Sequence, residues 1–439
     1  MRIQPFYTLT LTSFRQFSFF LACTLYGAFG SPTPNHPGIL EISVGALLVF
    51  AAGGEGGARI YRSLFSPQGS ARGSLGAACL LVYGLSVPLL IAFLSGNAPS
   101  SILRDLFPFL FLFCPLFFLP LFERKPANAG GVLFCLVFIG LMFSLRSLTA
   151  QAGWCGLLCG TELLYLENMP TVLFSGLFLA GAAVVCFMRG GGLLAYSVFF
   201  LLLFLSAIPF LAMALTLQRA SLGAYAVYLL VLLFLHFYAR PARTATLFIP
   251  ASCIVFLSAI FLPQFYLVFG EVFGKTALVG FNNRPQEAAA VWDAVSQNSL
   301  TMLFGLGWGA HFHSPAVGGL SVNFTHNFFT TMLLKTGLCG LIFSLVYIAG
   351  VARVLARVVF AVPVLGLALA APFLIDITLY ASFKSLDFGL TLLMIYLSLV
   401  YCKQSESFQP NKSFHASSDH TLHEPGVPSC PRRDRAGLA

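Results

Sequence analysis

The chain has 439 residues, of which 58% are hydrophobic and only 9% are charged. A water-soluble domain carries a charge on roughly a quarter of its residues, so this composition excludes a soluble fold of this length. The formal net charge of +9 would suggest nucleic-acid binding in a soluble protein. In a membrane protein, basic residues gather in the cytoplasmic loops instead, and we therefore expect no nucleic-acid partner.

Apolar runs long enough to cross the ~30 Å hydrocarbon core of a bilayer recur along most of the sequence. They predict an all-α polytopic membrane protein with about 12 transmembrane helices, forming a helical bundle over residues 1–402. The expected spans are 14–30, 38–53, 75–95, 102–122, 129–150, 170–188, 192–217, 221–239, 245–266, 324–350, 356–375 and 386–402. The polar remainder, 403–439, is expected to be a disordered cytoplasmic tail.

The distribution of basic residues predicts the orientation of these spans. Placing the N-terminus inside assigns 17 of the 24 Lys and Arg residues to the cytoplasmic side, and every inner loop then carries at least one. The first outer connection, Ser31–Pro37, carries none, and all three tryptophans (Trp154, Trp292 and Trp308) fall in outer loops. This asymmetry is typical of a multi-pass protein with both ends in the cytoplasm.

The 11 cysteines are scattered, mostly inside apolar runs, as small buried hydrophobic residues are. Cys155 and Cys159 lie together in one short connection, where a disulfide is one alternative. Three histidines, His311, His313 and His326, lie in or near one outer segment without an acidic partner close in the sequence. We therefore expect no metal site.

One outer connection, residues 267–323, is far longer than an ordinary loop, and long loops of this kind are usually functional. It contains a short predicted helix, because Asn283 and Gln286 resemble a capping box and Pro285 suits a first helical turn. An apolar stripe fits this helix to the membrane surface and consists of Ala288, Val291, Trp292 and Val295.

Two arginines occupy unusual positions. Arg284 lies at the start of the predicted helix, where the helix dipole disfavours a cation, and this placement favours a bound anion. The alternatives for Arg284 are lipid headgroups or an ion pair with Glu287. Arg219 lies between two very apolar runs, where an arginine is costly and often marks a site, although snorkelling to the interface is equally consistent.

A glycine-rich stretch, Phe304-Gly305-Leu306-Gly307-Trp308-Gly309, is followed by Thr325-His326-Asn327. The glycines allow a tight backbone, but they follow no strand and so imply no nucleotide fold. His326 opens the tenth apolar run, where a neutral imidazole can accept a proton near pH 7. An interfacial histidine without a chemical role is the alternative.

Four segments together resemble the signature region of the O-antigen ligase and polymerase superfamily. They are Asn283-Arg284 through Trp292, Gly305-Leu306-Gly307-Trp308-Gly309, His326-Asn327 and Lys335-Thr336-Gly337-Leu338-Cys339-Gly340-Leu341. The earlier Arg219-Ala220-Ser221-Leu222-Gly223 resembles another arginine segment of that family. Two departures stand beside the match: Gln218 replaces a serine, and no soluble C-terminal domain follows, unlike in some protein-glycosylating members.

The resemblance implies transfer of a glycan from undecaprenyl diphosphate at the periplasmic face of the bacterial inner membrane, without a metal or other cofactor. By matching position, Arg219 and Arg284 would bind the diphosphate and His326 would activate the acceptor hydroxyl. Supporting positions would be Asn327, Gly305, Gly307 and Asp376. Two guanidiniums that neutralise the leaving diphosphate can replace both a metal and a general acid.

Within this superfamily the sequence favours an O-antigen ligase, which moves O-polysaccharide onto the lipid A core. The alternative is the O-antigen polymerase, which joins two lipid-linked glycans. A lipid-linked glycan transporter is a more distant alternative, because the unusual charges gather at one face and no internal repeat is present. A metal-dependent polyprenyl-phosphate glycosyltransferase is disfavoured, since Ser31–Pro37 contains no acidic residue.

Overall fold

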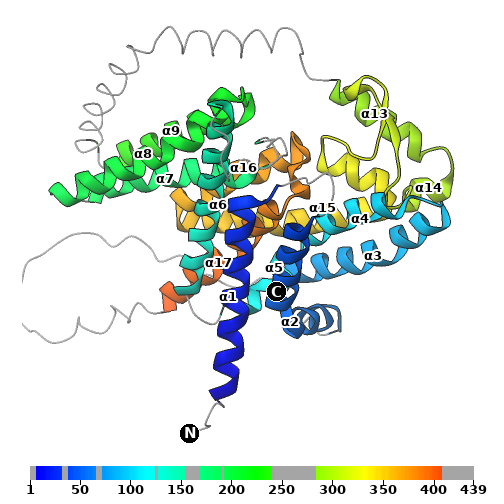
Figure 1. The fold of residues 1–439 in the computed structure, drawn as a ribbon, viewed down its shortest axis with the longest axis horizontal. Coiled ribbons are helices and arrows are strands. Elements are labelled where there is room, and N and C mark those ends of the chain that lie inside the picture. The colour runs from blue at the N-terminus through cyan, green and yellow to red at the C-terminus, as the bar shows by residue number, and fades with distance from the viewer. Residues whose placement is uncertain are drawn as a thin grey trace, which may run out of the picture.

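The computed structural model describes residues 6–31, 38–65, 72–123, 127–153, 166, 169–189, 192–239, 241 and 283–407. Most of these residues form α-helices, arranged as one bundle (Figure 1). The N-terminal helices are α1 (Phe6–Phe29), α2 (Ile39–Phe65), α3 (Arg72–Leu94), α4 (Pro99–Phe111), α5 (Cys114–Phe122), α6 (Ala127–Gln151), α7 (Pro170–Arg189), α8 (Leu193–Leu215) and α9 (Arg219–Ala239). The later helices are α13 (Arg284–Val295), α14 (Ser299–Phe304), α15 (Phe328–Ala361), α16 (Pro363–Thr378), η4 (Ala381–Lys384) and α17 (Leu386–Ser407).

Seven helices among the described residues are long and apolar enough to cross a membrane, and the bent pair α4–α5 raises this to eight. Two shorter apolar helices, Pro363–Thr378 and Leu386–Tyr401, accompany them. The chain is therefore an all-α, multi-pass membrane protein, as predicted, whereas the expected number of about 12 spans stays a prediction. The expected span 245–266, the pair Cys155 and Cys159, and most of the expected tail lie outside the described residues.

The structure refines two of the expected spans. The run 102–122 is bent, because α4 and α5 meet at an angle of 40°, and the two helices together are long and apolar enough for one broken span. Pro115 is the second residue of α5, where it has no N–H to donate and its ring crowds the carbonyl of residue 111, so the helix breaks just before it. Between 350 and 356, where a loop was expected, α15 continues to Ala361.

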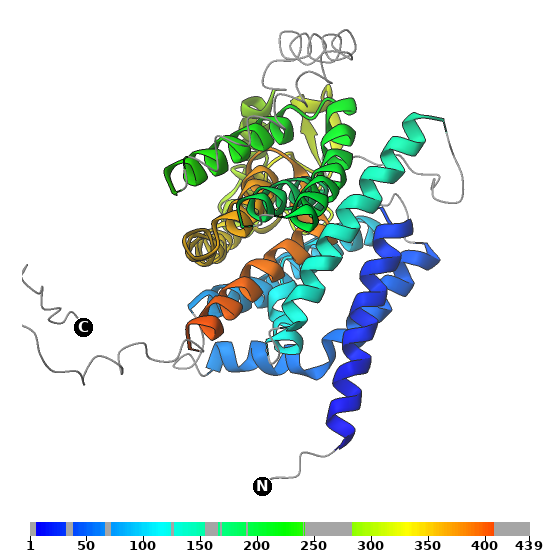
Figure 2. The same cartoon turned by 90° about the vertical axis from the view of Figure 1, so that its left-hand side faces the viewer.

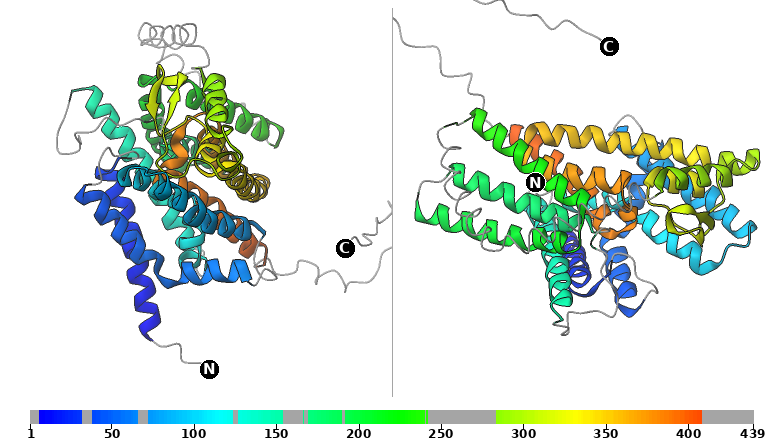
Figure 3. Two further views of the ribbon diagram at one scale, coloured as in Figure 1. Left: turned by 90° about the vertical axis from the view of Figure 1, so that its right-hand side faces the viewer. Right: turned by 90° about the horizontal axis from the view of Figure 1, so that it is seen from above.

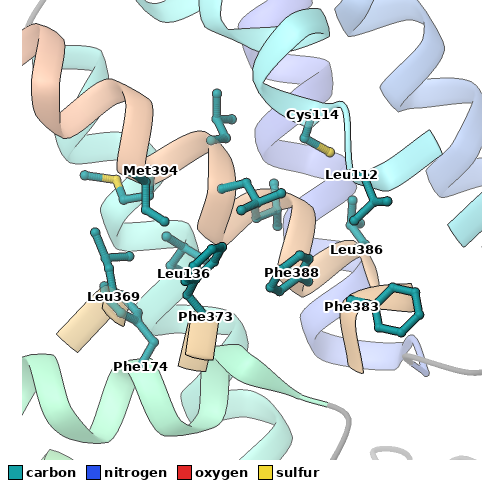
Figure 4. Packing of buried hydrophobic residues seen from close by; sticks show 14 of the residues in the cluster. Leu112, Cys114, Leu136, Phe174, Leu369, Phe373, Phe383, Leu386, Phe388 and Met394 are labelled. Carbon is teal, nitrogen blue, oxygen red and sulfur yellow. The ribbon is translucent and has the colours of Figure 1, made fainter. Parts of the chain in front are cut away.

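The bundle is built in layers around α6, which lies between α1 on one side and α7 and α8 on the other (Figure 2). The long helix α15 crosses the molecule beside α3 and α16 (Figure 3). Where α16 and α17 meet, the rings of Phe373 and Phe388 stack with centroids 6.2 Å apart (Figure 4). Leu136 of α6 and Phe174 of α7 are fully buried in the same core.

Several helix ends converge at one end of this bundle. Thr171, at the start of α7, donates a 2.8 Å hydrogen bond to Asp387 in the first turn of α17. Asn327, which caps the start of α15, donates a 3.1 Å hydrogen bond to the carbonyl of Thr378, where α16 ends. We call this region, where α7, α15 and α17 begin and α16 ends, the site end of the bundle.

The described part of the long loop, from residue 283 onward, folds onto the bundle rather than standing away from it (Figure 1). After α13 and α14 it forms an antiparallel hairpin of β1 (Phe312–Ser314) and β2 (Leu320–Val322), with a 3₁₀ turn η3 (Pro315–Val317) between them. In its register, Phe312 pairs with Val322. The sequence analysis predicted the helix of this loop but not its hairpin.

Candidate functional site

The helix α13 is where predicted, but the residues that it buries are not those of the expected apolar stripe. Glu287, Val291 and Val295 recur at a spacing of four and are at most 2% exposed, whereas Trp292 is 46% exposed. Val291 and Val295 pack against Phe312 of β1 and Leu334 of α15. The expectation of a stripe lying on the membrane surface is therefore wrong, because the hairpin and α15 cover that side of α13.

The expected capping box at the start of α13 does not form. Asn283 adopts the left-handed conformation at φ 53°, and its side chain makes no capping hydrogen bond. The backbone N–H of Glu287 donates instead to the carbonyl of Asn283, at 2.9 Å. Pro285 does occupy the first turn, as predicted, because a missing N–H costs nothing there. The left-handed residue starts the helix without using the Gln286 side chain.

The centre of the site is a hydrogen-bonded pair of Glu287 and His326. The Nδ1 atom of His326 lies 3.1 and 3.2 Å from the two carboxylate oxygens of Glu287. The backbone N–H of His326 donates to Oε2 of the same carboxylate at 3.0 Å, and Ser314 Oγ donates to Oε1 at 2.7 Å. Three donors thus hold a carboxylate that is almost entirely buried, while the His326 side chain remains 29% exposed.

This arrangement determines which ring nitrogen of His326 is available to accept a proton. With Nδ1–H donating to the carboxylate of Glu287, Nε2 is left unprotonated and able to accept a proton. A buried carboxylate behind the ring also stabilises the imidazolium that forms once Nε2 is protonated. In the neutral imidazole the Glu287–His326 pair therefore fixes the tautomer and leaves Nε2 as the ring nitrogen that can accept a proton.

The same contacts shift the titration of Glu287. Burial acts to raise the pKa of its carboxyl, but hydrogen bonds from the side chain and backbone of His326 and from Ser314 outweigh burial. The resulting pKa lies below the ordinary value of 4.5. A carboxyl with a lowered pKa in the folded state stabilises the protein above its ordinary pKa, and this contribution is lost as the pH falls through the lowered value.

We therefore expect the wild type to lose thermal stability relative to Glu287→Gln as the pH is lowered from 4.5 toward the pKa of the folded state. Glutamine does not titrate, so the difference in melting temperature between the two proteins should shrink within this window. Thermal unfolding of both proteins in detergent from pH 7 to pH 3 measures this difference. Parallel curves over the whole range would show that Glu287 is not held ionised by its donors.

Arg284 joins this pair from the same helix. It lies three residues before Glu287, which places both side chains on neighbouring positions of the α13 surface. Its guanidinium lies over the ring of Tyr380, with Cζ 5.7 Å from the ring centroid. Tyr380 lies two residues after Thr378, whose carbonyl accepts the hydrogen bond of Asn327. Because Asn327 directly follows His326, this places Arg284, His326 and Asn327 together at the site end. The alternative of an Arg284–Glu287 ion pair is wrong, since Glu287 pairs with His326.

Arg219 begins α9, and the direction of that helix gives its position. Tyr225 of α9 donates a hydrogen bond to the carbonyl of Gly176 on α7, and Tyr228 lies against Gly181 of the same helix. Both contacts advance in the same direction along the two helices, so α9 runs parallel to α7. Arg219 therefore lies toward the start of α7, at the site end of the bundle and partly buried.

Asp376 lies in the last turn of α16, two residues before Thr378, and is only 2% exposed. A carboxylate in the last turn of a helix is disfavoured by the helix dipole, so this position is not explained by helix stability. The structure thus places Asp376 at the same end of the bundle as the other predicted site residues.

Gly305 and Gly307 have a structural explanation that does not require a ligand. Both have φ of +80°, and a Cβ at Gly305 would lie 2.5 Å from the backbone nitrogen of Gly337. A Cβ at Gly307 would lie 2.6 Å from the backbone nitrogen of Ala92 in α3. Residues 305–310, which we call the glycine strap, therefore need glycine to press their backbone onto α3 and α15.

Trp308 anchors this strap, and its side chain is buried although it lies in the loop between α14 and β1. It is 2% exposed, and its indole N–H donates a 2.7 Å hydrogen bond to the carbonyl of Gly84, near the middle of the candidate span Leu75–Leu94. Pro88, four residues later in α3, has no N–H to donate to that carbonyl. The indole thus satisfies a carbonyl that the proline leaves without its helical partner.

Sequence reasoning missed Glu287 and Ser314 as members of the site. A signal for Glu287 was present, because it precedes Val291 and Val295 at the helical spacing of four and so lies in phase with an apolar face. A charged residue on such a face needs a buried partner. No comparable signal pointed to Ser314, whose position depends on the hairpin.

Among the residues that the structure describes, no three His, Cys, Asp or Glu side chains lie close enough together to hold a metal ion. His313 Nδ1 lies 3.1 Å from the carbonyl of Gly319 within the hairpin, and His326 pairs with Glu287. The histidines of the loop thus have separate surroundings. No protein-family model matches the sequence, and no curated protein sequence matches it significantly.

Proposed function

We propose that the protein is a glycosyltransferase of the O-antigen ligase type, which transfers a glycan from undecaprenyl diphosphate to the lipid A core. The observation that carries this proposal is the Glu287–His326 pair, with Nδ1 held 3.1 Å from a buried carboxylate oxygen and Arg284 on the same helix. A proton acceptor beside a cation suits attack of a hydroxyl on a carbon that carries a diphosphate leaving group. The resemblance of the signature segments supports the choice of substrate class.

In the proposed reaction, Nε2 of His326 accepts the proton of the acceptor hydroxyl as its oxygen attacks the anomeric carbon. The bond between that carbon and the phosphate oxygen breaks, and undecaprenyl diphosphate leaves with the electron pair. Attack from the side opposite the leaving group inverts the anomeric configuration. The imidazolium, stabilised by Glu287, later releases its proton to solvent.

Arg219 and Arg284 are proposed to bind the diphosphate. A guanidinium keeps its charge at any physiological pH and can form two parallel hydrogen bonds to a phosphate. Its interaction with the diphosphate therefore becomes stronger as negative charge develops on the leaving group. Asn327 would support the site indirectly, since it caps α15 through a 2.7 Å hydrogen bond to the backbone N–H of Phe329 and binds the carbonyl of Thr378. Asp376 is proposed to orient a basic partner at the same end.

The orientation of the chain belongs to the same proposal. We propose about 12 spans, both termini in the cytoplasm, and the site end of the bundle at the periplasmic face of the inner membrane. The support comes from the positive-inside distribution of basic residues and from the loop that carries α13. Residues 403–439 would then belong to a cytoplasmic tail, of which 403–407 continue α17.

Lipopolysaccharide gels of a deletion strain test the proposal. Wild type is expected to restore the high-molecular-weight ladder, whereas Arg219→Ala, Arg284→Ala and His326→Ala leave bare lipid A core while lipid-linked polymer accumulates. Asp293→Asn, at an exposed position of the same helix as Arg284, serves as the matched control and should restore the ladder.

Other outcomes of the same experiment identify the rival functions. Core carrying a single repeat unit in the deletion strain would identify an O-antigen polymerase. Lipid-linked glycan trapped on the cytoplasmic side would identify a transporter. An unchanged ladder in every strain would contradict all three readings.

A further inference from the structure

A buried cluster of charges lies behind the glycine strap. Asp105 of α4 is 4% exposed, and its Oδ2 lies 2.7 Å from Nζ of Lys335, which is fully buried on α15. Lys384, at the end of η4, approaches the other carboxylate oxygen at 3.6 Å. The backbone N–H of Gly309 also donates to Oδ2 at 2.8 Å, so this carboxylate joins α4, α15, η4 and the strap.

The two lysines of this cluster are not equivalent. Lys335 donates to Asp105 and, at 2.6 Å, to the carbonyl of Ala310, so two of its three N–H groups have acceptors. Lys384 makes no hydrogen bond to any described residue, since 3.6 Å from Asp105 is beyond hydrogen-bond range. Its side chain is 14% exposed and can therefore reach a ligand, which that of Lys335 cannot.

The charges of the cluster do not balance. Within the described part of the chain, Asp105 is the carboxylate that pairs with both ammonium groups, which leaves one positive charge in excess. An uncompensated charge in surroundings poor in water is unfavourable, and an anion beside it would be bound strongly. Because Lys335 is satisfied by Asp105 and Ala310, the excess charge resides on Lys384.

The position of Lys384 connects this charge to the proposed site. It ends η4, the short helix that follows Tyr380, on whose ring the guanidinium of Arg284 lies. The preceding residue, Phe383, packs edge-on against Phe328 with ring centroids 5.0 Å apart, and Phe328 follows the His326-Asn327 pair directly. The segment 380–384 therefore contacts Arg284 through Tyr380 and the start of α15 through Phe383, and it ends with Lys384.

We propose that Lys384 is a third cationic ligand of the donor diphosphate, beside Arg284 and Arg219. This inference rests on the proposed function, because it takes the anion to be a polyprenyl diphosphate. The ammonium moves from its loose contact with Asp105 to a phosphate oxygen and donates the hydrogen bonds that it does not make in the protein. Asp105 and Lys335 remain paired and hold the strap, so Lys384 acts in binding and takes no proton in the reaction.

Binding of farnesyl diphosphate, a short polyprenyl diphosphate, tests this inference. The full-length protein in phosphatidylcholine nanodiscs would be titrated with the probe and the dissociation constant measured by calorimetry. Lys384→Gln should weaken binding by about 10-fold or more, the value expected for one lost hydrogen bond between charged groups. Lys384→Arg should stay within about 3-fold of wild type because it keeps the charge.

Arg104→Gln is the matched control, because Arg104 adjoins Asp105 on α4 but is exposed, and it should bind like wild type. Equal binding by wild type and Lys384→Gln would refute the role of Lys384 and leave the proposed function intact. Failure of wild type to bind farnesyl diphosphate would instead refute the proposed donor, and the role of Lys384 with it. Loss of binding when phosphatidylglycerol replaces part of the phosphatidylcholine would show a general site for lipid headgroups and would also overturn the inference.

A thermal unfolding curve of each variant accompanies the titration. If Lys384→Gln melts like wild type and binds the probe weakly, the lost affinity is a direct effect of the missing ammonium. If Lys384→Gln melts early, the comparison of Lys384→Met with Lys384→Arg decides the question. Weak binding by a Lys384→Met protein that melts like wild type, with binding kept in Lys384→Arg, supports a direct role of the charge. Equal binding by both variants would show that Lys384 has only a structural role.

Discussion

Replacing Glu287 by glutamine is expected to lower the rate of glycan transfer by ~10²–10⁴-fold, the range found for loss of a general base or of the group that orients it. The amide keeps the shape of the side chain but presents an N–H₂ group where His326 and Ser314 both donate. The imidazole then loses its fixed tautomer, and its protonated form loses the buried negative charge that stabilises it. Transfer from a purified lipid-linked donor to lipid A core, measured in detergent or nanodiscs, gives this rate.

Asp293→Asn is the control for this prediction, because it makes the same kind of change at an exposed position of the same helix. It should transfer glycan at the wild-type rate. Donor affinity should also survive in Glu287→Gln, since the carboxylate does not contact the proposed diphosphate. A Glu287→Gln protein that folds and transfers at the wild-type rate would rule out His326 as the general base.

Replacing Asp105 by alanine is expected to destabilise the protein by ~3–5 kcal/mol, because it removes the carboxylate that neutralises the fully buried ammonium of Lys335. It also removes the acceptor of the Gly309 backbone N–H, and with it a contact that holds the glycine strap. Thermal unfolding in detergent, or the amount of folded protein recovered from membranes, measures the effect. Asp293→Ala, which changes an exposed aspartate, should leave both unchanged.

A second substitution separates the charge from the packing in this prediction. Asp105→Ala combined with Lys335→Met should recover a large part of the lost stability, because the fully buried ammonium is then absent as well. If the double variant is as unstable as the sum of the two single variants, the pair contributes through packing and not through its charges. If Asp105→Ala alone melts like wild type, the cluster is not a structural element at all.

Most of the helices could be predicted from the sequence because hydrophobicity alone determines which segments enter a bilayer. The bend between α4 and α5 was missed since an unbroken apolar run hides a proline that starts a new helix. The end of α15 was placed wrongly because residues 351–355, expected to form a loop, lie on a helix that continues to Ala361. Composition therefore predicts that a segment is helical more reliably than it predicts where the helix ends.

In the candidate site, too, some residues could be predicted from the sequence and others could not. Arg284, His326 and Asn327 were predicted as one site, and their approach in the structure follows from the contact of α13 with the start of α15. Glu287 was missed since its burial depends on Ser314 and on His326, 39 residues away along the chain. The partner of Asp105, Lys335, is 230 residues distant in sequence and therefore beyond the reach of any local pattern.

The hydrogen bond from Trp308 to Gly84 also has a consequence for biosynthesis. The two residues are separated by 224 positions, so α3 enters the bilayer long before its indole partner has been translated. Until then the Gly84 carbonyl, which Pro88 leaves without a helical donor, has no partner in hydrocarbon, a condition that costs several kcal/mol. The nascent N-terminal helices thus lack a hydrogen-bond donor for this carbonyl. The glycine strap can pack on α3 and supply that donor only after the later segments have been inserted. Assembly of the site would then be among the last events of synthesis, so that a chain interrupted before Trp308 leaves the ribosome with a defect that membrane quality control can detect.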